Sequence, residues 1–336
     1  MQIMEPALYG AFHCIGGTCP DTCCAAWEVV VDPASAEKYR KAGGVIGERL
    51  RSVMEQDGED TIFRLQNGRC PFLNKQNLCD LYIELGEAAL CATCTKYPRF
   101  THVYGGVTER GLSLSCPEAA RLLLEPTEPM AFITRTEAGF PEPNALNPTL
   151  YLSLRKARAA VFGMLQNRSL PLEERARRLW AAGQAMQKTI NRHHYAEIVP
   201  VCGRFLEAGA HDVSLPELPA KSLDFLTQTL PRRLDSLTPE DTPDALWAAC
   251  PRAAVMLEHF LVYGVYRYWM EAAYDRQLLS QVRLCIRLYR LAAALAAQTV
   301  RKTGTISKEA LRKLISLCCK EIEHSSENLE IFSAVL

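Results

Sequence analysis

The chain has 336 residues, of which 48% are hydrophobic and 23% charged. This is the composition of a folded globular protein long enough for two or three domains. Its 38 basic residues balance its 38 acidic ones, so no overall field attracts nucleic acid or an anionic membrane surface, and neither is expected as a partner.

Residues 1–12 lack the basic region and apolar run of a signal peptide. Charge interrupts the longest apolar stretches, as Arg287 and Arg290 do within residues 284–300, so no membrane span is expected. We therefore expect a soluble, cytoplasmic protein. In that reducing compartment, clustered cysteines bind metal or do chemistry more often than they form disulfides.

The first 125 residues have mixed patterns. Residues 27–31 predict a short strand, and Asp32-Pro33 predicts a helix start, with the helix ending at Gly43-Gly44. Residues 100–104 and 107–114 flank Gly105-Gly106 as a predicted hairpin. Residues 115–118 match a capping box that opens a helix at 118–124. Residues 1–125 are thus predicted to form a small cysteine-rich α+β module.

Residues 126–148 contain five prolines and little periodicity, which indicates a linker or an extended crossing segment. Beyond them, apolar residues recur at three- and four-residue spacing. The predicted helices cover residues 150–165, 172–190, 195–208, 223–234, 246–274 (broken at Pro251), 278–300 and 308–332. The prediction is a mainly α protein in which residues 149–336 form an all-α domain.

Nine of the fourteen cysteines lie in the first 116 residues. They are Cys14, Cys19, Cys23, Cys24, Cys70, Cys79, Cys91, Cys94 and Cys116. This density exceeds what a buried core needs and favours a metal or cluster site. The five later cysteines have apolar helical surroundings and are expected to be buried small residues.

The first cysteines lie on a loop rich in glycine and proline, and a turn at residues 74–77 should bring Cys70 close to Cys79. Adjacent Cys23 and Cys24 are expected to point in different directions and so not to bind one ion together. Cys116 begins a helix, where free backbone N–H groups favour the thiolate. Cys91 is expected to be a buried small residue.

Two kinds of metal site fit this pattern. Structural zinc takes four thiolates or a cysteine and histidine mixture, usually as two close pairs. Iron–sulfur clusters take thiolates almost exclusively, often with one remote ligand. Since His13 and His102 are the only histidines in the first 190 residues and the spacing is irregular, the sequence favours iron–sulfur without excluding zinc.

Several motifs follow one another in this region. They are Cys-Pro-Asp-Thr-Cys-Cys at 19–24, Cys-Pro-Phe-Leu at 70–73, Leu-Cys at 78–79, Cys-x2-Tyr-Pro-Arg at 94–99 and Ser-Cys-Pro-Glu-Ala-Ala-Arg at 115–121. A wider group of zinc- or iron-chelating proteins shares some of them, but the whole set resembles the flagellin lysine N-methylase family. The resemblance covers residues 8–125, continues in the aromatic stretch 258–269, and does not include Cys91.

The resemblance implies methyl transfer from S-adenosylmethionine to lysine amines of flagellin, which is exported after modification, so the enzyme would act in the cytoplasm. It also implies a [4Fe-4S] cluster held by N-terminal cysteines. The matching positions are Cys14, Cys19, Cys23, Cys24, Cys70, Cys79, Cys94 and Cys116. Eight thiols exceed the four ligands of one cluster, so some have another role.

The chain lacks the glycine-rich loop and alternating strand–helix pattern of the common methyltransferase fold, and also the Cys-x3-Cys-x2-Cys signature of radical enzymes. Polar and radical mechanisms both stay open. Tyr263 and Tyr266, with Glu258, could line a lysine channel, although aromatic residues at helical spacing usually form core. Tyr97 and Arg99 could contact a cofactor carboxylate, or Arg99 could pair with Glu109 or Glu118.

Two other hypotheses compete with the enzyme. One is a non-catalytic zinc- or iron-binding module that mediates a protein–protein interaction. The other is metal delivery or redox sensing through exposed thiols. The family resemblance places the methylase first.

Overall fold

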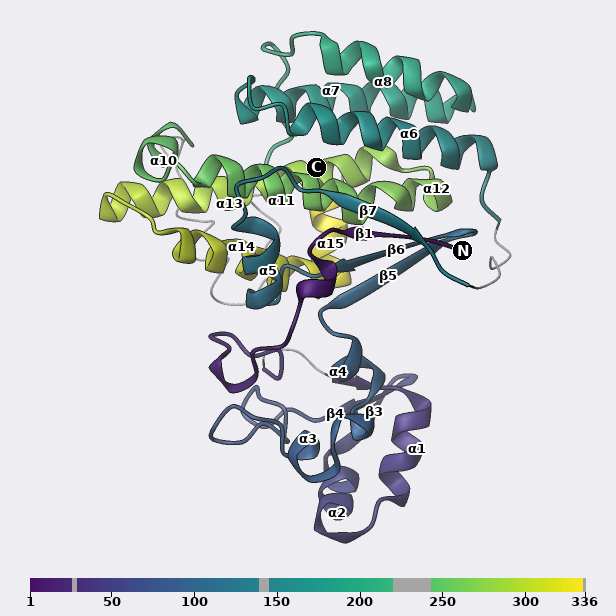
Figure 1. Cartoon of the computed structure of the whole chain (residues 1–336), viewed down its shortest axis with the longest axis vertical. Coiled ribbons are helices and arrows are strands. Elements are labelled where there is room, and N and C mark those ends of the chain that lie inside the picture. Colours follow the sequence, from purple (N-terminus) through teal and green to yellow (C-terminus); the bar gives the residue numbers. More distant parts are fainter. Residues whose placement is uncertain (26–28, 139–144, 220–242, 335–336) are drawn as a thin grey trace.

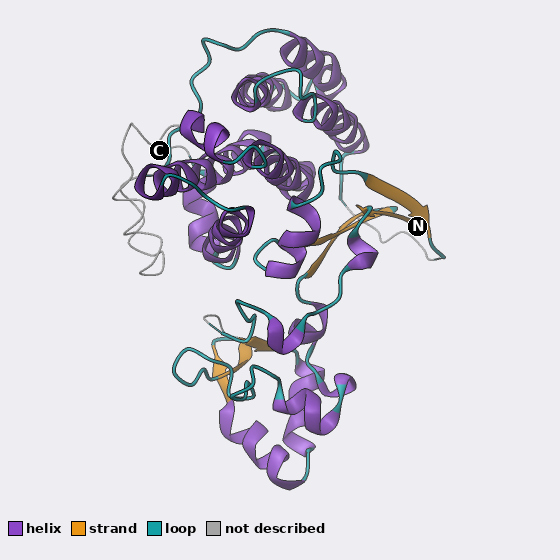
Figure 2. Cartoon of the chain, turned by 60° about the vertical axis from the view of Figure 1, so that its left-hand side comes forward, coloured by secondary structure: helices purple, strands orange, loops and turns teal. Residues whose placement is uncertain are grey.

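The computed structural model describes residues 1–25, 29–138, 145–219 and 243–334. It has a small lobe, at the bottom of Figure 1, and a large lobe that holds most of the helices. A loop that follows the first strand and the hairpin-bearing segment after α4 connect the two lobes (Figures 1 and 2).

A four-stranded sheet lies against the helices of the large lobe (Figure 2), in the order β5-β6-β1-β7. Its strands are β1 (Gln2–Pro6), β5 (Arg99–Tyr104), β6 (Val107–Leu112) and β7 (Phe132–Thr136). The predicted hairpin around Gly105-Gly106 is confirmed, since β5 and β6 pair antiparallel. β7 was not predicted: it lies in the proline-rich segment and pairs antiparallel with β1, while β1 runs parallel to β6.

The small lobe combines a three-stranded sheet, ordered β2-β4-β3, with four helices. Its elements are β2 (Val29–Val31), α1 (Pro33–Lys41), α2 (Gly44–Val53), β3 (Met54–Asp57), β4 (Asp60–Phe63), α3 (Asp80–Leu85) and α4 (Ala92–Lys96). The predicted helix start is confirmed, because Asp32 Oδ1 accepts from the backbone N–H of Ser35. Asp32 Oδ2 accepts from the N–H of Ala92 at 2.8 Å, which ties α4 to the start of α1.

The helices of the large lobe agree with the predicted pattern. They are α5 (Pro117–Leu124), α6 (Pro148–Leu165), α7 (Leu172–Asn191), α8 (Ile198–Glu207), α10 (Pro243–Ala249), α11 (Ala253–Tyr268), α12 (Ala272–Asp275), α13 (Leu278–Thr303), α14 (Lys308–Glu323) and α15 (Ser326–Ser333). The break near Pro251 is confirmed. The single helix expected over 308–332 is two helices, because Ser325 caps α15 through the N–H of Asn328. The predicted helix 223–234 lies outside the described residues.

The buried apolar residues form two separate cores. One lies within the small lobe and draws only on residues from Val29 to Cys91. The other joins Phe12, the β5–β6 hairpin and α5 to the helices of the large lobe. The packing therefore groups the hairpin and α5 with the helices, whereas the predicted module boundary at 125 grouped them with the cysteines. The apolar face of α5 packs on α11 and α14, which explains the difference.

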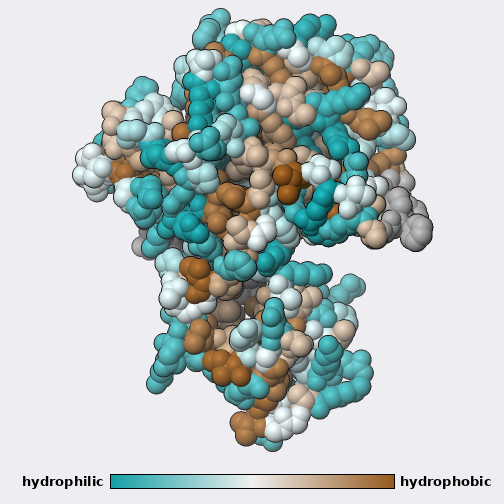
Figure 3. All heavy atoms as spheres, in the orientation of Figure 1, coloured by the Kyte–Doolittle hydropathy of each residue, from teal (hydrophilic) through white to brown (hydrophobic). Residues whose placement is uncertain are grey.

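In the part of the chain that the structure describes, no helix is long and apolar enough to cross a membrane. Figure 3 shows a mostly mixed surface, with apolar side chains gathered on the small lobe. Exposed apolar residues of that lobe include Val45 at the start of α2 and Tyr82, Ile83 and Leu85 on α3.

Candidate functional site

The first group of cysteines lies where the two lobes meet. Cys14, Cys19, Cys23 and Cys116, here called the inter-lobe thiols, are each close enough to others of the group to affect their pKa values. The loop that carries the first three is compact: the N–H of Gly16 donates to Cys14 Sγ at 3.4 Å, and Cys19 Sγ donates to the carbonyl of Asp21 at 3.3 Å. Asp21 pairs with Lys320 of α14 at 2.9 Å, which fixes the loop to the large lobe.

The second group lies inside the small lobe. Cys24, Cys70, Cys79, Cys91 and Cys94, here called the small-lobe thiols, all belong to or pack against the small-lobe core. The charges of Cys24, Cys79 and Cys91 contribute to the raised pKa of Cys70. In the same way, the charges of Cys91, Cys24 and Cys70 contribute to the raised pKa of Cys94. Cys91 is fully buried, as predicted, but its sulfur contacts that of Cys94 through a hydrogen bond, so it belongs to the thiol group.

The prediction that Cys23 and Cys24 point in different directions is wrong, since their side chains hydrogen-bond to one another. Their other neighbours nevertheless differ. The charges of Cys14 and Cys116 contribute to the raised pKa of Cys23. The charge of Arg69 acts to lower the pKa of Cys24, and the charge of Cys24 contributes to the raised pKa of Cys70. The adjacent pair is therefore the point at which the two groups touch.

Burial sets the protonation of most of these thiols. It raises the pKa of Cys70 to about 12 and that of Cys116 to about 11. The N–H groups of Glu118 and Ala119 lower the pKa of Cys116, as expected at a helix start, but burial outweighs them. The hydrogen bond from Cys94 lowers the pKa of Cys91 to about 7.

The predicted capping box at 115–118 is wrong. Cys116 is the N-cap residue, and no side-chain cap hydrogen bond forms there. Glu118 instead pairs with Arg121 at 2.6 Å, and the Ser115 hydroxyl takes part in a buried polar network. Local spacing suggested a cap, but tertiary partners compete successfully for both side chains.

That network links the two lobes and lies next to the inter-lobe thiols. The hydroxyl of Ser115 is 3.0 Å from that of Tyr97 and 2.6 Å from that of Ser113, and Ser113 donates to Glu323 at 2.9 Å. His324 Nε2 also lies 3.0 Å from the Ser115 hydroxyl. The charges of Cys116 and Cys23 contribute to the raised pKa of Tyr97, so these two thiols lie near the Tyr97 end of the network.

Its inner end is an ion pair. Glu323, whose side chain is fully buried, accepts from Tyr263 at 3.2 Å and pairs with Arg267 at 3.3 Å. Arg267 Nη1 donates to the Tyr263 hydroxyl at 2.9 Å, and its guanidinium lies over the Phe100 ring. Burial raises the pKa of Tyr97 and Tyr263, so both phenols stay protonated, and that of Tyr263 donates to Glu323.

The structure brings two of the five predicted catalytic residues, Tyr97 and Tyr263, into this network. Arg99 is exposed at the same junction: its guanidinium stacks over the Phe12 ring at 4.9 Å. The expected alternative partners of Arg99 are engaged elsewhere, because Glu109 pairs with Arg158 and Glu118 with Arg121.

Glu258 and Tyr266 have other surroundings. Glu258 is buried and forms ion pairs with Arg168 at 2.8 Å and Arg175 at 2.6 Å, which join α11 to the loop before α7 and to α7 itself. The Tyr266 hydroxyl donates to the carbonyls of Met4 and Arg110, which fixes the sheet to α11. These contacts give both residues a structural role in the described fold.

Sequence reasoning missed the other members of the network. Ser113, Glu323 and His324 belong to no motif that was singled out, Arg267 lies within the stretch 258–269 but was given no role, and Ser115 was assigned to a cap. The sequence signals were therefore that stretch and the position of Ser115 within the Ser-Cys-Pro-Glu motif, beside a predicted metal ligand. The partners on α14 and α11 lie about 150 to 210 positions away, as the hydrogen bonds show.

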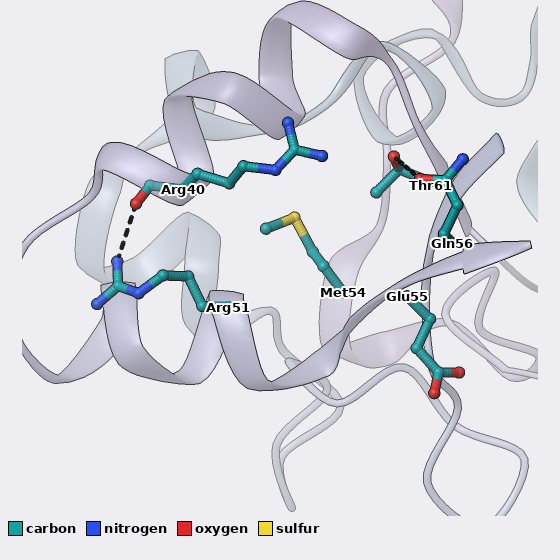
Figure 4. A pocket seen from close by; sticks show the side chains of 6 residues that line it. All are labelled: Arg40, Arg51, Met54, Glu55, Gln56 and Thr61. Carbon is teal, nitrogen blue, oxygen red and sulfur yellow. Dashed lines mark hydrogen bonds between the residues drawn. The ribbon is translucent and has the colours of Figure 1, made fainter. Parts of the chain in front are cut away.

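Surface hollows occur away from these residues. Figure 4 shows one of about 230 Å³ in the small lobe, lined by Arg40, Arg51, Met54, Glu55, Gln56 and Thr61. Arg51 donates there to the carbonyl of Arg40 at 3.2 Å. Its lining includes no cysteine, so it gives the thiols no binding cavity.

The donor set fits a thiolate-bound metal. The nine N-terminal cysteines, all of which the structure describes, form no disulfide, and they gather in two groups of four and five sulfurs. No three cysteine, histidine or acidic side chains of the described residues are already arranged as ligands of one ion. Binding would therefore require the thiols to lose their protons and turn toward a common centre.

The fold and the site together define a cysteine-rich protein in which a thiol-bearing small lobe meets a helical lobe beside a buried polar network. The family model described as "FliB lysine N-methylase C-terminal domain" matches residues 158–336, slightly more than half of the chain. The chain belongs to the FliB lysine N-methylase family, which confirms the resemblance read from the sequence. The matched region is the helical part, where the motifs offered only the stretch 258–269.

Similar curated proteins support the same family assignment. A "Lysine-N-methylase" of Salmonella typhimurium is 29% identical over 150 residues, which are 40% of this chain and 36% of that protein, and the Salmonella choleraesuis protein of that name matches equally. The "Flagellar biosynthetic protein FliU" of Salmonella muenchen is 30% identical over 145 residues, 39% of this chain and 82% of that protein. The match thus spans about a third of each lysine-N-methylase. No solved structure matches.

Proposed function

We propose that the protein is an S-adenosylmethionine-dependent protein-lysine N-methyltransferase that acts on flagellin in the cytoplasm, before export. Family membership supports the activity, and the flagellar name of one relative supports the substrate. The observation that carries the proposal is the polar network of Tyr97, Ser115, Ser113 and Glu323 beside the inter-lobe thiols.

The chemistry needs a neutral amine. In a direct transfer, the methyl–sulfur bond breaks as the nitrogen–carbon bond forms, S-adenosylhomocysteine leaves, and the nitrogen loses a proton. The Tyr97 and Ser115 hydroxyls can orient the amine, and the line of hydroxyls offers its proton a path to Glu323. The guanidinium of Arg99, held over Phe12, can bind the cofactor's carboxylate.

The inter-lobe thiols Cys14, Cys19, Cys23 and Cys116 would hold the [4Fe-4S] cluster. They comprise three ligands on one loop and one remote ligand, a common arrangement for such clusters. Bound by all four thiols, the cluster would supply a source of electrons; bound by only three of them, it would also leave one iron open to the sulfonium cofactor. The charges of Cys116 and Cys23 contribute to the raised pKa of Tyr97, which supports an amine site near the cofactor.

The test is methylation of purified flagellin by the oxygen-free protein with S-adenosylmethionine, measured by mass spectrometry of the lysines. We expect wild type to methylate flagellin and Tyr97→Phe to be slower by about tenfold or more, the scale of a lost proton-handling group. Tyr39→Phe is the control, because Tyr39 is a buried tyrosine outside the network, and its hydroxyl donates to the carbonyl of Ala89 in the small lobe.

Two results would contradict the proposal. Binding of flagellin without methylation would favour the non-catalytic module. Equal rates for Tyr97→Phe and Tyr39→Phe would remove the network from the mechanism.

A further inference from the structure

We propose that the small-lobe hollow of Figure 4 docks an acidic segment of a partner protein in an extended conformation. A carboxylate of that segment binds Arg40, and its main chain pairs with the free edge of β3. The lining of the hollow includes no cysteine and no residue of the polar network, so the proposal does not depend on the methylase activity.

Arg40 supplies a cation that no described residue neutralises. It lies in the last turn of α1 and is exposed, and its guanidinium extends over the hollow toward Gln56 and Thr61 (Figure 4). No hydrogen bond or ion pair joins this guanidinium to another residue that the structure describes. Such an arginine favours a carboxylate, which its planar group can bind through two parallel hydrogen bonds.

The other two charged residues of the lining leave this cation available. Arg51 donates to the carbonyls of Arg40 at 3.2 Å and Ala42 at 2.6 Å, so it caps the carboxyl end of α1 and keeps its own charge. Glu55 pairs with Arg64, and Figure 4 shows its carboxylate directed away from Arg40. The hollow therefore has a net positive charge, which suits an acidic ligand.

β3 gives the hollow a free backbone edge. It is an outer strand, since the sheet order is β2-β4-β3. The N–H of Arg64 donates to the carbonyl of Val53 at 2.8 Å, which makes these two residues a hydrogen-bonded pair. Such pairs alternate along an antiparallel ladder, so Gln56 has its N–H and carbonyl directed away from β4. An extended peptide can add to this edge as a further strand.

The same geometry brings a side chain of the added strand to the hollow. Side chains of one strand alternate between the two faces of a sheet, and Met54 and Gln56 share the face that borders the hollow. An added strand would lie about 4.8 Å from β3, so a glutamate on this face can reach Arg40 across Met54. The hollow, of about 230 Å³, is smaller than a usual small-molecule pocket, which favours a single side chain of a peptide.

The test is calorimetric titration of the full chain with short peptides blocked at both ends. The probe is Thr-Val-Glu-Val-Thr, whose β-branched residues favour an extended conformation. We expect it to bind wild type and to bind Arg40→Gln about tenfold or more less tightly, the scale of hydrogen bonds to a charged group. Lys38→Gln is the matched control: it removes one positive charge from the same helix, outside the lining, and should bind like wild type.

Two further peptides separate the two parts of the contact on the wild-type protein. Thr-Val-Gln-Val-Thr lacks the carboxylate and should bind about tenfold or more less tightly. Thr-Pro-Glu-Pro-Thr keeps the carboxylate but lacks two backbone donors, so it should also bind less tightly.

No binding of the glutamate peptide at millimolar concentration would overturn the proposal, as would equal weakening by Arg40→Gln and Lys38→Gln. Equal affinity for the proline peptide would exclude strand pairing. Acetate or inorganic phosphate that competes as tightly as the peptide would indicate an ion site and overturn peptide docking. All readouts are dissociation constants of peptides, so a failed methylase assay leaves them standing, and the reverse also holds.

Discussion

The inter-lobe thiols and the small-lobe thiols differ in their burial and in the side chains around them. The inter-lobe thiols are exposed or half-buried and adjoin a network of hydroxyls, a carboxylate and a guanidinium. The small-lobe thiols include two that are buried, and apolar side chains such as Phe72 and Leu81 share their core. Access and polar neighbours suit chemistry, whereas burial among apolar side chains suits packing. The surroundings therefore distinguish the inter-lobe thiols from the small-lobe thiols, which cysteine spacing alone does not.

The largest expected effect comes from breaking the inner end of the network. Glu323→Leu leaves Arg267 without its ion-pair partner and removes an acceptor from Ser113 and Tyr263. We expect a loss of about 3–5 kcal/mol in the free energy of unfolding, measured by denaturant titration. Glu37→Gln, in an exposed pair with Lys41, should change it by less than about 0.5 kcal/mol. Similar losses in both would mean that the network is not a buried unit.

A change in the other region should act on the small lobe alone. Leu81 is 2% exposed in the small-lobe core, so Leu81→Ala should cost about 2–5 kcal/mol of that lobe's stability. Hydrogen exchange should accelerate in α1 to α4 and stay unchanged in α13. Faster exchange throughout the chain would show that the two cores unfold together.

A smaller effect is expected at the contact between the cysteine loop and α14. Lys320→Ala removes the ion pair with Asp21 and should cost about 0.5–1 kcal/mol. The loop should become more mobile, so a cluster at the inter-lobe thiols should lose iron faster in air. A visible-spectrum time course checks this, and unchanged iron loss would separate the loop contact from the cluster.

The smallest effect is a pH dependence confined to the small lobe. The N–H groups of Ala92 and Ser35 lower the pKa of Asp32 to about 2. Because the pKa is lower in the folded state, the stabilisation is present above about pH 4 and is lost as the pH falls toward 2. Exchange in α4 should therefore rise over that range in wild type and less so in Asp32→Asn. An identical pH profile in the variant would exclude Asp32 as the cause.

Much of the fold could be predicted from the sequence. The helices of the large lobe follow their apolar periodicity, and the β5–β6 hairpin follows its two glycines. β7 could not be predicted, because it exists only through its pairing with β1, about 130 residues earlier. Of the polar network, Tyr97 and Tyr263 were among the candidates from the sequence, while Glu323 and His324 had no local signal.

By itself, the sequence determined that the protein is mainly helical, that its N-terminal cysteines form an unusual concentration, and that the motifs around them resemble those of a lysine N-methylase family. Periodicity and motifs are local features, so they can be recognised in the sequence without the structure. Only the tertiary structure decided that the thiols form two groups, that Cys91 joins one of them, and that α14 supplies Glu323 and Lys320 to the other. These facts depend on contacts between distant segments, which form when two separate cores bury their apolar faces.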